Sequence, residues 1–284
     1  RLADFDVLVL NRERTTLNRA LISRLPTLKL ICQTGRVGPH IDLAAAAERG
    51  VKVVEGVGDP VAPAELTWAL ILAASRKIPQ YASLMKQGWW QATSIHPVQN
   101  TLGRTLNTRV MGIWGYGRIG QRVARFADAF GMQVMVWGSE AGRERAVADG
   151  FSAAPSKADL FAQSDVLSLH LRLSDSTRHS VLAGDLASMK PDALIVNTSR
   201  AELIAPGALE AALRAGRPGH AALDVFESEP LPPTAALLQL DNVLATPHIG
   251  FVEQDSYEKY FRPAFEAIVD FVNGRPVSDI ASNR

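Results

Sequence analysis

Short apolar strands alternate with amphipathic helices along nearly the whole chain, and this alternation restricts the possible folds more than any other feature of the sequence. The pattern predicts strands at residues 6–10, 28–32, 51–54, 109–114, 132–137, 165–169, 193–197, 220–225 and 242–245. It predicts helices at residues 16–25, 41–49, 60–77, 118–130, 156–163, 184–189, 206–215 and 252–273. Such alternation is typical of α/β proteins built on parallel sheets. With 284 residues, the chain is long enough for two domains of modest size.

Composition argues against several broad classes of function. A formal net charge of +1 provides no broad basic surface, so nucleic acid is not an expected partner. The single cysteine, Cys32, cannot form a disulfide within the chain and lies in an apolar run, so we expect a buried structural thiol. No cysteines or histidines have the spacing of metal ligands, so no metal is expected.

The same reasoning addresses localisation. The apolar stretches are too short to cross a bilayer, and no signal peptide is visible. The chain starts at Arg1 rather than at a methionine, so we expect that residues preceding it in the natural protein are missing. A cytoplasmic protein without membrane contact is the simplest prediction.

A glycine-rich turn, Gly115-Tyr116-Gly117-Arg118-Ile119-Gly120, lies between a predicted strand and a predicted helix. In a turn with the spacing G-x-G-x-x-G, the first glycine permits a tight bend and the second lets a pyrophosphate approach the backbone. The third lets helix and strand pack closely. The N-terminus of the following helix then faces the phosphates with free N–H groups and the positive end of its dipole. The turn therefore predicts a Rossmann-like unit that binds a dinucleotide.

The acidic residue that usually binds the ribose of NAD is missing from its expected position. This residue normally ends the second strand of the nucleotide-binding unit, about 20 residues after the glycines. Here Gly138 occupies the position, and Glu140 lies two residues further along. Arg143 and Arg145 follow, and they are suited either to a solvated helix surface or to the 2′-phosphate of NADP. The sequence favours NAD slightly and leaves NADP open.

Three residues with complementary chemistry, Arg200, Glu229 and His248, each follow a predicted strand. A guanidinium group binds a carboxylate through two parallel hydrogen bonds. An imidazole transfers protons near neutral pH, and a carboxylate can orient the ring by accepting from its second nitrogen. Open α/β sheets build their sites at the carboxyl ends of their strands, so we expect the three side chains to act together. With a dinucleotide, they are suited to hydride transfer to or from a 2-oxo acid.

The chain resembles the family of D-isomer-specific 2-hydroxyacid dehydrogenases, among them the phosphoglycerate dehydrogenases and the glyoxylate or hydroxypyruvate reductases. The motifs that carry the resemblance are the glycine turn, Asn197-Thr198-Ser199-Arg200, Asp224-Val225-Phe226-Glu227-Ser228-Glu229-Pro230 and Thr246-Pro247-His248-Ile249-Gly250. The resemblance implies that Arg200 binds the substrate carboxylate, that His248 is the acid and base, and that Glu229 is its partner. It implies cofactor contacts at Gly115, Tyr116, Gly117, Arg118, Ile119, Gly120, Ser139, Leu171, Arg172, Thr198, Ser199, Arg200, Asp224, His248 and Gly250.

The resemblance also implies a substrate loop near the N-terminus, formed by Gly35, Arg36, Val37 and Gly38. The backbone amides of this loop would hold the substrate carboxylate, together with Arg200 and His248. Arg36 and Val37 are larger than the small residues usually found there, which leaves the identity of the substrate open. The charge of Arg36 is suited to a second anionic group on the substrate.

The family further implies two parallel-sheet domains, Rossmann-like or flavodoxin-like, with a cleft between them. Residues 1–76 and 252–284 would form the substrate domain, because the last helix is expected to return to the first domain. Residues 77–251 would form the NAD(P)-binding domain. Residues 77–108 would join two copies into a homodimer.

Two alternatives to a 2-hydroxyacid dehydrogenase remain open. A catalytically weak protein of the same fold could sense NAD(H) and bind a protein partner. The presence of Arg200, Glu229 and His248 argues against this alternative, because a sensor has no need for all three. An amino-acid dehydrogenase or a hydrolase with bound NAD is a further alternative, but the sequence shows no lysine-based or cysteine-based site to support it.

Overall fold

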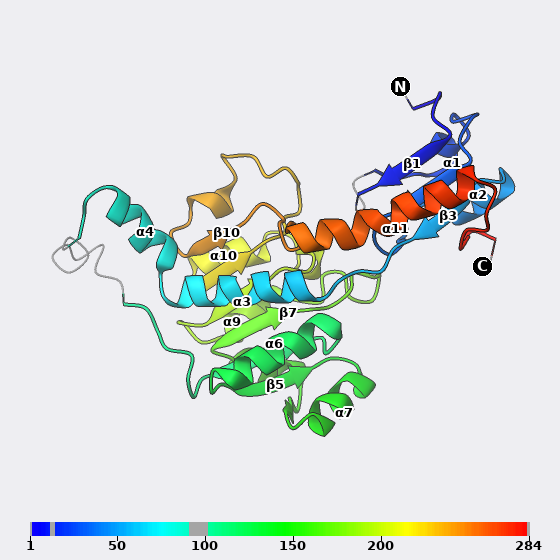
Figure 1. Cartoon of the computed structure of the whole chain (residues 1–284). Helices are drawn as coiled ribbons and strands as arrows, with labels where there is room; N and C mark the ends of the chain where they lie inside the picture. Colours follow the sequence, from blue (N-terminus) through cyan, green and yellow to red (C-terminus); the bar gives the residue numbers. More distant parts are fainter. Residues whose placement is uncertain (1, 12–14, 91–101, 283–284) are drawn as a thin grey trace. The chain divides into compact units, whose positions relative to one another are not determined.

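The computed structural model describes residues 2–11, 15–90 and 102–282, and the chain divides into two compact units (Figure 1). The first unit comprises residues 1–59 and 251–284, and the second comprises residues 60–250. Each unit is built on one sheet in which every neighbouring pair of strands is parallel. The predicted fold class, α/β with parallel sheets, is therefore confirmed.

The sheet of the first unit has the order β1-β2-β3. Its strands and the helices that follow the first two are β1 (Val7–Leu10), α1 (Arg19–Ile22), β2 (Leu30–Gln33), α2 (Leu43–Glu48) and β3 (Lys52–Glu55). Successive side chains of a strand point to opposite faces of the sheet. Ile31 accordingly packs in one apolar cluster with residues of α1 and α2, while Leu30 and Cys32 pack in another.

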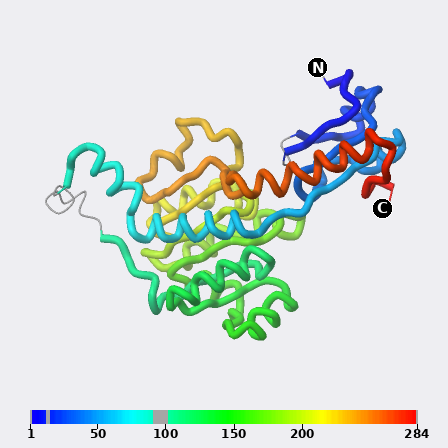
Figure 2. Tube along the Cα trace, in the orientation of Figure 1, coloured from blue at the N-terminus to red at the C-terminus, as the bar shows by residue number. Residues whose placement is uncertain are grey.

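The last helix, α11 (Gln254–Val272), covers the second face of this sheet. Ala264, Ile268 and Phe271 of α11 share the cluster of Leu30 and Cys32, so the predicted return of this helix to the N-terminal part of the chain is confirmed. Figure 2 shows both ends of the chain in this unit. Cys32 is fully buried, and burial raises the pKa of its thiol to about 11, as expected for a structural residue.

The second unit contains a seven-stranded sheet with the order β10-β9-β8-β7-β4-β5-β6. The strands are β4 (Val110–Trp114), β5 (Gln133–Trp137), β6 (Ser152–Ala153), β7 (Val166–Leu169), β8 (Leu194–Asn197), β9 (His220–Leu223) and β10 (Val243–Ala245). From β4 the chain builds outward through β5 and β6 on one side and through β7 to β10 on the other. Ligands of open α/β sheets bind at such a switch in strand order, beyond the carboxyl ends of the strands.

Helices cover both faces of this sheet. One apolar cluster joins the sheet to α3 (Val61–Ser75) and α6 (Arg118–Ala129), and a second joins its other face to α8 (Lys157–Gln163), α9 (Ala183–Ser188) and α10 (Ala208–Arg214). Short 3-10 helices, η1 (Ala201–Leu203) and η2 (Ala236–Gln239), lie in the loops after β8 and β9. None of the helices in the described part of the chain is long and apolar enough to cross a membrane.

Helix α3 belongs to the second unit, whereas the sequence placed residues up to 76 in the first domain. Ala64, Trp68 and Ile71 of α3 are buried in the cluster that contains α6 and β4, and the rings of Trp68 and Phe130 pack edge to face with their centroids 4.9 Å apart. The apolar pattern of the helix predicted burial on more than one side, but it did not identify the sheet that the helix covers.

Within the described residues, two α-helices and one strand were not predicted from the sequence: α4 (Ile78–Lys86), α7 (Glu140–Ala148) and β6. The short 3-10 helices η1 and η2 were not predicted either. α4 buries none of its residues, and α7 buries only Ala146, so neither has an apolar face of the usual width. β6 has only two residues and forms the edge of the sheet. The arm predicted at residues 87–108 lies partly outside the described residues.

Candidate active site

The parallel strands of the second unit bring the predicted site residues to one edge of the sheet. Trp114, Leu169, Asn197, Leu223 and Ala245 end β4, β7, β8, β9 and β10, and they pair with one another in a single row. The glycine turn and the loops that begin with residues 170, 198, 224 and 246 directly follow this row. Side chains that are far apart in the sequence are thereby collected beyond the carboxyl ends of the strands.

The glycine turn has the geometry that a pyrophosphate-binding turn requires. Gly115 has φ of +103°, and a Cβ atom added there would lie 2.7 Å from the carbonyl oxygen of His170. A Cβ atom added at Gly120 would lie 2.2 Å from the carbonyl oxygen of Gly115. Gly117 precedes α6, is exposed, and would place a Cβ atom in open space. The first and third glycines are therefore required by packing, while the second leaves room at the helix N-terminus for a phosphate group.

Several other residues expected to contact the cofactor lie around this turn. Leu171 is in contact range of Gly115, because its Cδ2 atom would be 3.2 Å from an added Cβ. The hydroxyl of Ser199 donates to the carbonyl of Leu169 over 2.9 Å. Tyr116 points its ring into the core, where its hydroxyl donates to Asp149, so only its backbone borders the surface of the turn. Arg118 begins α6 and is exposed, and Ile119 packs against the core.

Arg200 stands on a turn that is fixed by Asn197. The buried amide of Asn197 donates from Nδ2 to the carbonyl of Arg200 over 2.9 Å and accepts from the backbone N–H of Ser199 over 3.0 Å. Thr198 shares a hydrogen bond of 2.7 Å with Thr67 of α3. The guanidinium of Arg200 donates to the carbonyl of Ser199 over 2.8 Å. Asn197 was quoted in the motif without a role, although a buried amide directly after an apolar strand indicates one.

His248 and Glu229 form a hydrogen-bonded pair. The Nδ1 atom of His248 lies 2.6 Å from Oε2 of Glu229, and the side chain of His248 is 23% exposed. The second carboxylate oxygen of Glu229 accepts from the backbone N–H of Phe226 over 3.0 Å. With Nδ1–H donated to Glu229, the Nε2 atom of the ring is directed away from the carboxylate, which is the orientation that proton transfer to a substrate requires.

The loop that carries His248 is anchored on the buried carboxylate of Asp224. This carboxylate is fully buried and accepts from the hydroxyl of Thr246 over 2.6 Å. It also accepts from the backbone N–H groups of Ile249 and Gly250, both over 2.8 Å. His248 itself has φ of +55°, a conformation that is uncommon for residues other than glycine. Strained conformations persist where the surroundings determine them, and they cluster at functional sites. Asp224, expected from the family to contact the cofactor, thus already holds the His248 loop.

The proposed substrate loop of the first unit differs from expectation at one backbone amide. The N–H of Val37 donates to Oε2 of Glu55 over 2.9 Å, so this amide is already occupied. The guanidinium of Arg36 donates to Oε1 of the same carboxylate over 3.1 Å. Glu55 was not singled out in the sequence. The signal available in the sequence was a carboxylate at the end of an apolar strand, directly before a glycine, Gly56.

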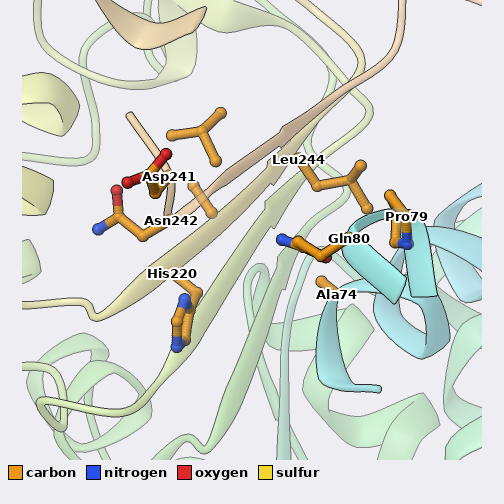
Figure 3. Close-up of a pocket in the computed structure, with 9 residues that line it drawn as sticks. Ala74, Pro79, Gln80, His220, Asp241, Asn242 and Leu244 are labelled. Carbon is orange, nitrogen blue, oxygen red and sulfur yellow. The ribbon is translucent and has the colours of Figure 1, made fainter. Parts of the chain in front are cut away.

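A separate pocket lies at the opposite end of the strands. Figure 3 shows its lining, to which His220 and Val243, the first residues of β9 and β10, contribute. The remaining lining residues are Ala74, Pro79, Gln80, Ala221, Asp241, Asn242 and Leu244. Because parallel strands have their amino ends at one edge of the sheet, this pocket lies away from His248 and the glycine turn.

His220 in this pocket makes stability depend on pH. Burial, with the nearby charges of Lys77 and Arg104, lowers the pKa of His220 to about 4, and Nζ of Lys77 lies 3.4 Å from its ring. The unfolded chain then binds a proton as the pH falls through 6.5, while the folded protein stays neutral at this residue until about pH 4. The free energy of unfolding should therefore decrease as the pH is lowered from 6.5 to about 4.

We expect His220→Gln to reduce the loss of stability between pH 7 and pH 5 by about 1 kcal/mol, after allowance for partial exposure. The glutamine can still accept from Lys77 but cannot be protonated. Urea unfolding at the two pH values measures the difference, with the exposed His179→Gln as control. An equal pH dependence in wild type and His220→Gln would contradict the prediction.

A glycine turn at the switch in strand order and an imidazole–carboxylate pair on the same sheet edge together define a dinucleotide-dependent oxidoreductase. Residues 68–250, more than half of the chain, match the family described as D-isomer specific 2-hydroxyacid dehydrogenase, NAD binding domain. The chain belongs to this family, and NAD(H) is its cofactor. The resemblance inferred from the four motifs is thereby confirmed.

Individual relatives agree with this assignment. The chain is 38% identical to a glyoxylate reductase of Aeropyrum pernix, over 90% of its own length and 76% of that protein. It is 36% identical to a D-3-phosphoglycerate dehydrogenase of Methanocaldococcus jannaschii, but it spans only about half (52%) of that relative's length. A crystal structure of a phosphoglycerate oxidoreductase of Vibrio cholerae is 53% identical with a TM-score of 0.90, covering 96% of this chain and 86% of that one.

Proposed function

We propose that this protein reversibly reduces a small 2-oxo acid to the D-2-hydroxy acid with a nicotinamide cofactor. The observation that carries the proposal is the 2.6 Å hydrogen bond between His248 and Glu229, on a loop held by Asp224. An imidazole oriented in this way can donate a proton from Nε2 to a carbonyl oxygen and remove it again in the reverse direction. The glycine turn on the same sheet edge supports a cofactor close to this imidazole.

In the reducing direction, each residue has one task. Arg200 pairs with the substrate carboxylate through its guanidinium and fixes the orientation of the carbonyl group. Bound NADH supplies the hydride that reaches C2 of the substrate. His248 donates its Nε2 proton to the developing alkoxide, and Glu229 stabilises the positive charge of the ring while that proton is present. Asp224 keeps the His248 loop in position through the three hydrogen bonds described above.

The first unit supplies the substrate specificity in this proposal. We assign residues 1–59 with 251–284 to substrate binding, and the loop Gly35–Gly38 to the substrate carboxylate. Glu55 neutralises Arg36 and occupies the amide of Val37, so the loop offers little charge for a second anionic group. We therefore propose a substrate without a phosphate group, such as glyoxylate or hydroxypyruvate, in preference to phosphohydroxypyruvate.

The test is the oxidation of NADH, followed by its absorbance, with glyoxylate, hydroxypyruvate, 3-phosphohydroxypyruvate and a bulky 2-oxo acid as separate substrates. We expect the highest kcat/KM with glyoxylate or hydroxypyruvate, the two small acids that carry no charged group besides the carboxylate. A higher kcat/KM for the phosphorylated substrate would overturn the substrate class. Dinucleotide binding without turnover of any 2-oxo acid would refute the proposed reductase activity and favour a sensor that binds a protein partner.

We also propose that two copies of the chain associate through the segment that includes α4. This helix buries none of its residues, and Ile78, Met85 and Trp90 are 52%, 49% and 76% exposed. Exposed apolar side chains grouped on one segment mark an interaction surface. We expect Trp90→Asp to shift the protein from dimer to monomer in sedimentation equilibrium, while exposed Phe265→Asp on α11 leaves the mass unchanged. A monomeric wild-type protein would contradict this proposal.

A further inference from the structure

The N-terminal half of helix α3 lies beside the loop that carries His248. Gly250, two residues after His248, is buried, and its backbone N–H is held by Asp224. A Cβ atom added to Gly250 would lie 3.7 Å from Cβ of Pro63 and 3.8 Å from Cδ2 of Leu66, both on α3. These are ordinary van der Waals distances, so the end of the His248 loop packs against this part of the helix.

Thr67, one turn further along α3, contacts the turn that carries Arg200. Thr67 is fully buried, and its Oγ1 atom donates to the carbonyl of Pro63 over 2.7 Å. The same atom shares a second hydrogen bond, also of 2.7 Å, with the hydroxyl of Thr198. A hydroxyl carries one proton, and a carbonyl can only accept. The proton of Thr67 is therefore committed to Pro63, and the hydroxyl of Thr198 must be the donor to Thr67.

The Arg200 turn is thus held by two different parts of the second unit. Asn197 and the hydroxyl of Ser199 attach it to the sheet, through hydrogen bonds to the carbonyls of Arg200 and Leu169. Thr198 attaches it to α3. Since the His248 loop packs on the same helix, the bond to α3 sets the position of the Arg200 turn relative to that loop.

Packing alone does not require a hydroxyl at position 67. The neighbouring residues Ala64, Trp68 and Ile71 of α3 are buried in an apolar cluster. A hydroxyl in such surroundings costs free energy unless it is hydrogen-bonded, and a threonine that donates to the carbonyl four residues earlier slightly disfavours a helix. Valine has nearly the same shape without either cost. What threonine adds is an acceptor for the proton of Thr198.

We infer that Thr67 is a positioning residue for the proposed reduction. By accepting from Thr198, it fixes the Arg200 turn at a set distance from the His248 loop. The inference rests on the proposed function, because it concerns the groups that would bind the substrate carboxylate and transfer the proton. Thr67 touches no reacting atom and acts through Thr198. A displacement of about 1 Å between such groups is sufficient to slow a reaction markedly.

Two substitutions at position 67 test the role of the hydroxyl. Thr67→Val keeps the shape and removes the acceptor. We expect it to lower kcat/KM for the preferred 2-oxo acid about five- to thirtyfold, mainly through a higher KM, because a displaced guanidinium binds the carboxylate less well. Thr67→Ser keeps the hydroxyl and should retain at least about half of the wild-type kcat/KM. A residue that served packing alone would give no such rescue and no separation of KM from kcat.

A double-mutant cycle with Thr198→Val isolates the bond between the two hydroxyls. Once the donor has been removed, Thr67→Val should lower kcat/KM by less than about twofold more. Ser164→Ala is the matched control, because this fully buried hydroxyl donates to the carbonyl of Leu160 in α8, again four residues earlier. Its loss should leave kcat/KM within about twofold of wild type. Urea unfolding of every variant shows that folded proteins are being compared.

Binding of oxamate, an analogue of a 2-oxo acid that is not reduced, provides a measurement without turnover. We expect Thr67→Val to weaken the binding of oxamate to the NADH complex about five- to thirtyfold in isothermal titration calorimetry. Thr67→Ser should bind it nearly as wild type does. The affinity for NADH alone should change by less than about threefold in both variants, because the bond acts on the carboxylate-binding turn.

The outcomes distinguish this inference from the proposed reaction. Turnover by wild type with an unchanged kcat/KM in Thr67→Val would overturn the inference alone, as would equal losses in Thr67→Val and Thr67→Ser. Fully additive effects of Thr67→Val and Thr198→Val would also overturn it. Oxamate binding that weakens as expected, in a protein that reduces no 2-oxo acid, would support the inference and refute the reaction. A wild-type protein with neither oxamate binding nor turnover would refute both.

Discussion

Replacing His248 with alanine is expected to lower kcat by about a hundred- to ten thousandfold while the affinity for NADH stays within about threefold. The imidazole is the group that we propose for proton transfer, because Glu229 holds its Nδ1 atom and so orients the ring with Nε2 directed away from the carboxylate. The side chain is partly exposed and packs no core, so its loss should cost little stability. Steady-state kinetics with the preferred 2-oxo acid and a separate NADH titration measure the two effects.

Glu229→Gln serves as the matched control for His248→Ala. The glutamine keeps an oxygen that can accept from Nδ1, but it removes the charge that stabilises a protonated ring. We expect a smaller loss of kcat than in His248→Ala, with unchanged cofactor affinity. Turnover of His248→Ala close to wild type would show that another group transfers the proton. A loss of NADH binding equal to the loss of kcat would assign His248 to the cofactor instead.

Two glycine-to-alanine substitutions in the same turn should have opposite effects on folding and on binding. Gly120→Ala is expected to destabilise the protein by about 3 kcal/mol or more, or to prevent folding, because backbone atoms must shift to admit the Cβ. That Cβ would lie only 2.2 Å from the carbonyl oxygen of Gly115. Gly117→Ala should keep the wild-type melting temperature, since Gly117 has an ordinary backbone conformation with φ of −85° and open space around it.

Gly117→Ala should instead lose dinucleotide affinity, by at least about tenfold, because its methyl group occupies the space through which a pyrophosphate approaches the backbone. Thermal unfolding with and without NADH measures both quantities in one experiment. A Gly120→Ala protein as stable as wild type would show that the turn is looser than its contacts indicate. A Gly117→Ala protein with wild-type affinity would place the pyrophosphate away from this turn.

The sequence predicted the elements that have a clear period or a strong boundary residue. All nine predicted strands are present within a few residues, because each is an apolar run bounded by polar residues or glycine. The helix predicted at residues 16–25 contains only Arg19–Ile22 as α1, where Asn18 caps the N-terminus and Pro26 follows soon after the end. Helices α4 and α7 were missed since their stability does not depend on a buried apolar face.

The chemistry of the site was predictable in its residue types, and less so in its contacts. Motif spacing and strand ends were sufficient to expect Glu229 beside His248, and the structure places them 2.6 Å apart. The folded geometry determines which residue a buried or charged group contacts. Glu55 binding the amide of Val37 and Arg143 stacking on Trp137 each join residues of different elements, and neither spacing nor composition specifies them. The assignment of α3 to the second unit was missed for the same reason.

The anchoring of the His248 loop by Asp224 makes the position of the imidazole independent of much of the chain in between. Asp224 directly follows β9, the loop directly follows β10, and the two strands are paired neighbours. The segment from residue 231 to residue 241 lies in the connection between these paired strands. The distance from Asp224 to His248 is set by the pairing of the strands and not by the length of this segment. Such a segment can lengthen, shorten or carry an inserted peptide during evolution or engineering while the imidazole of His248 stays in register with the sheet.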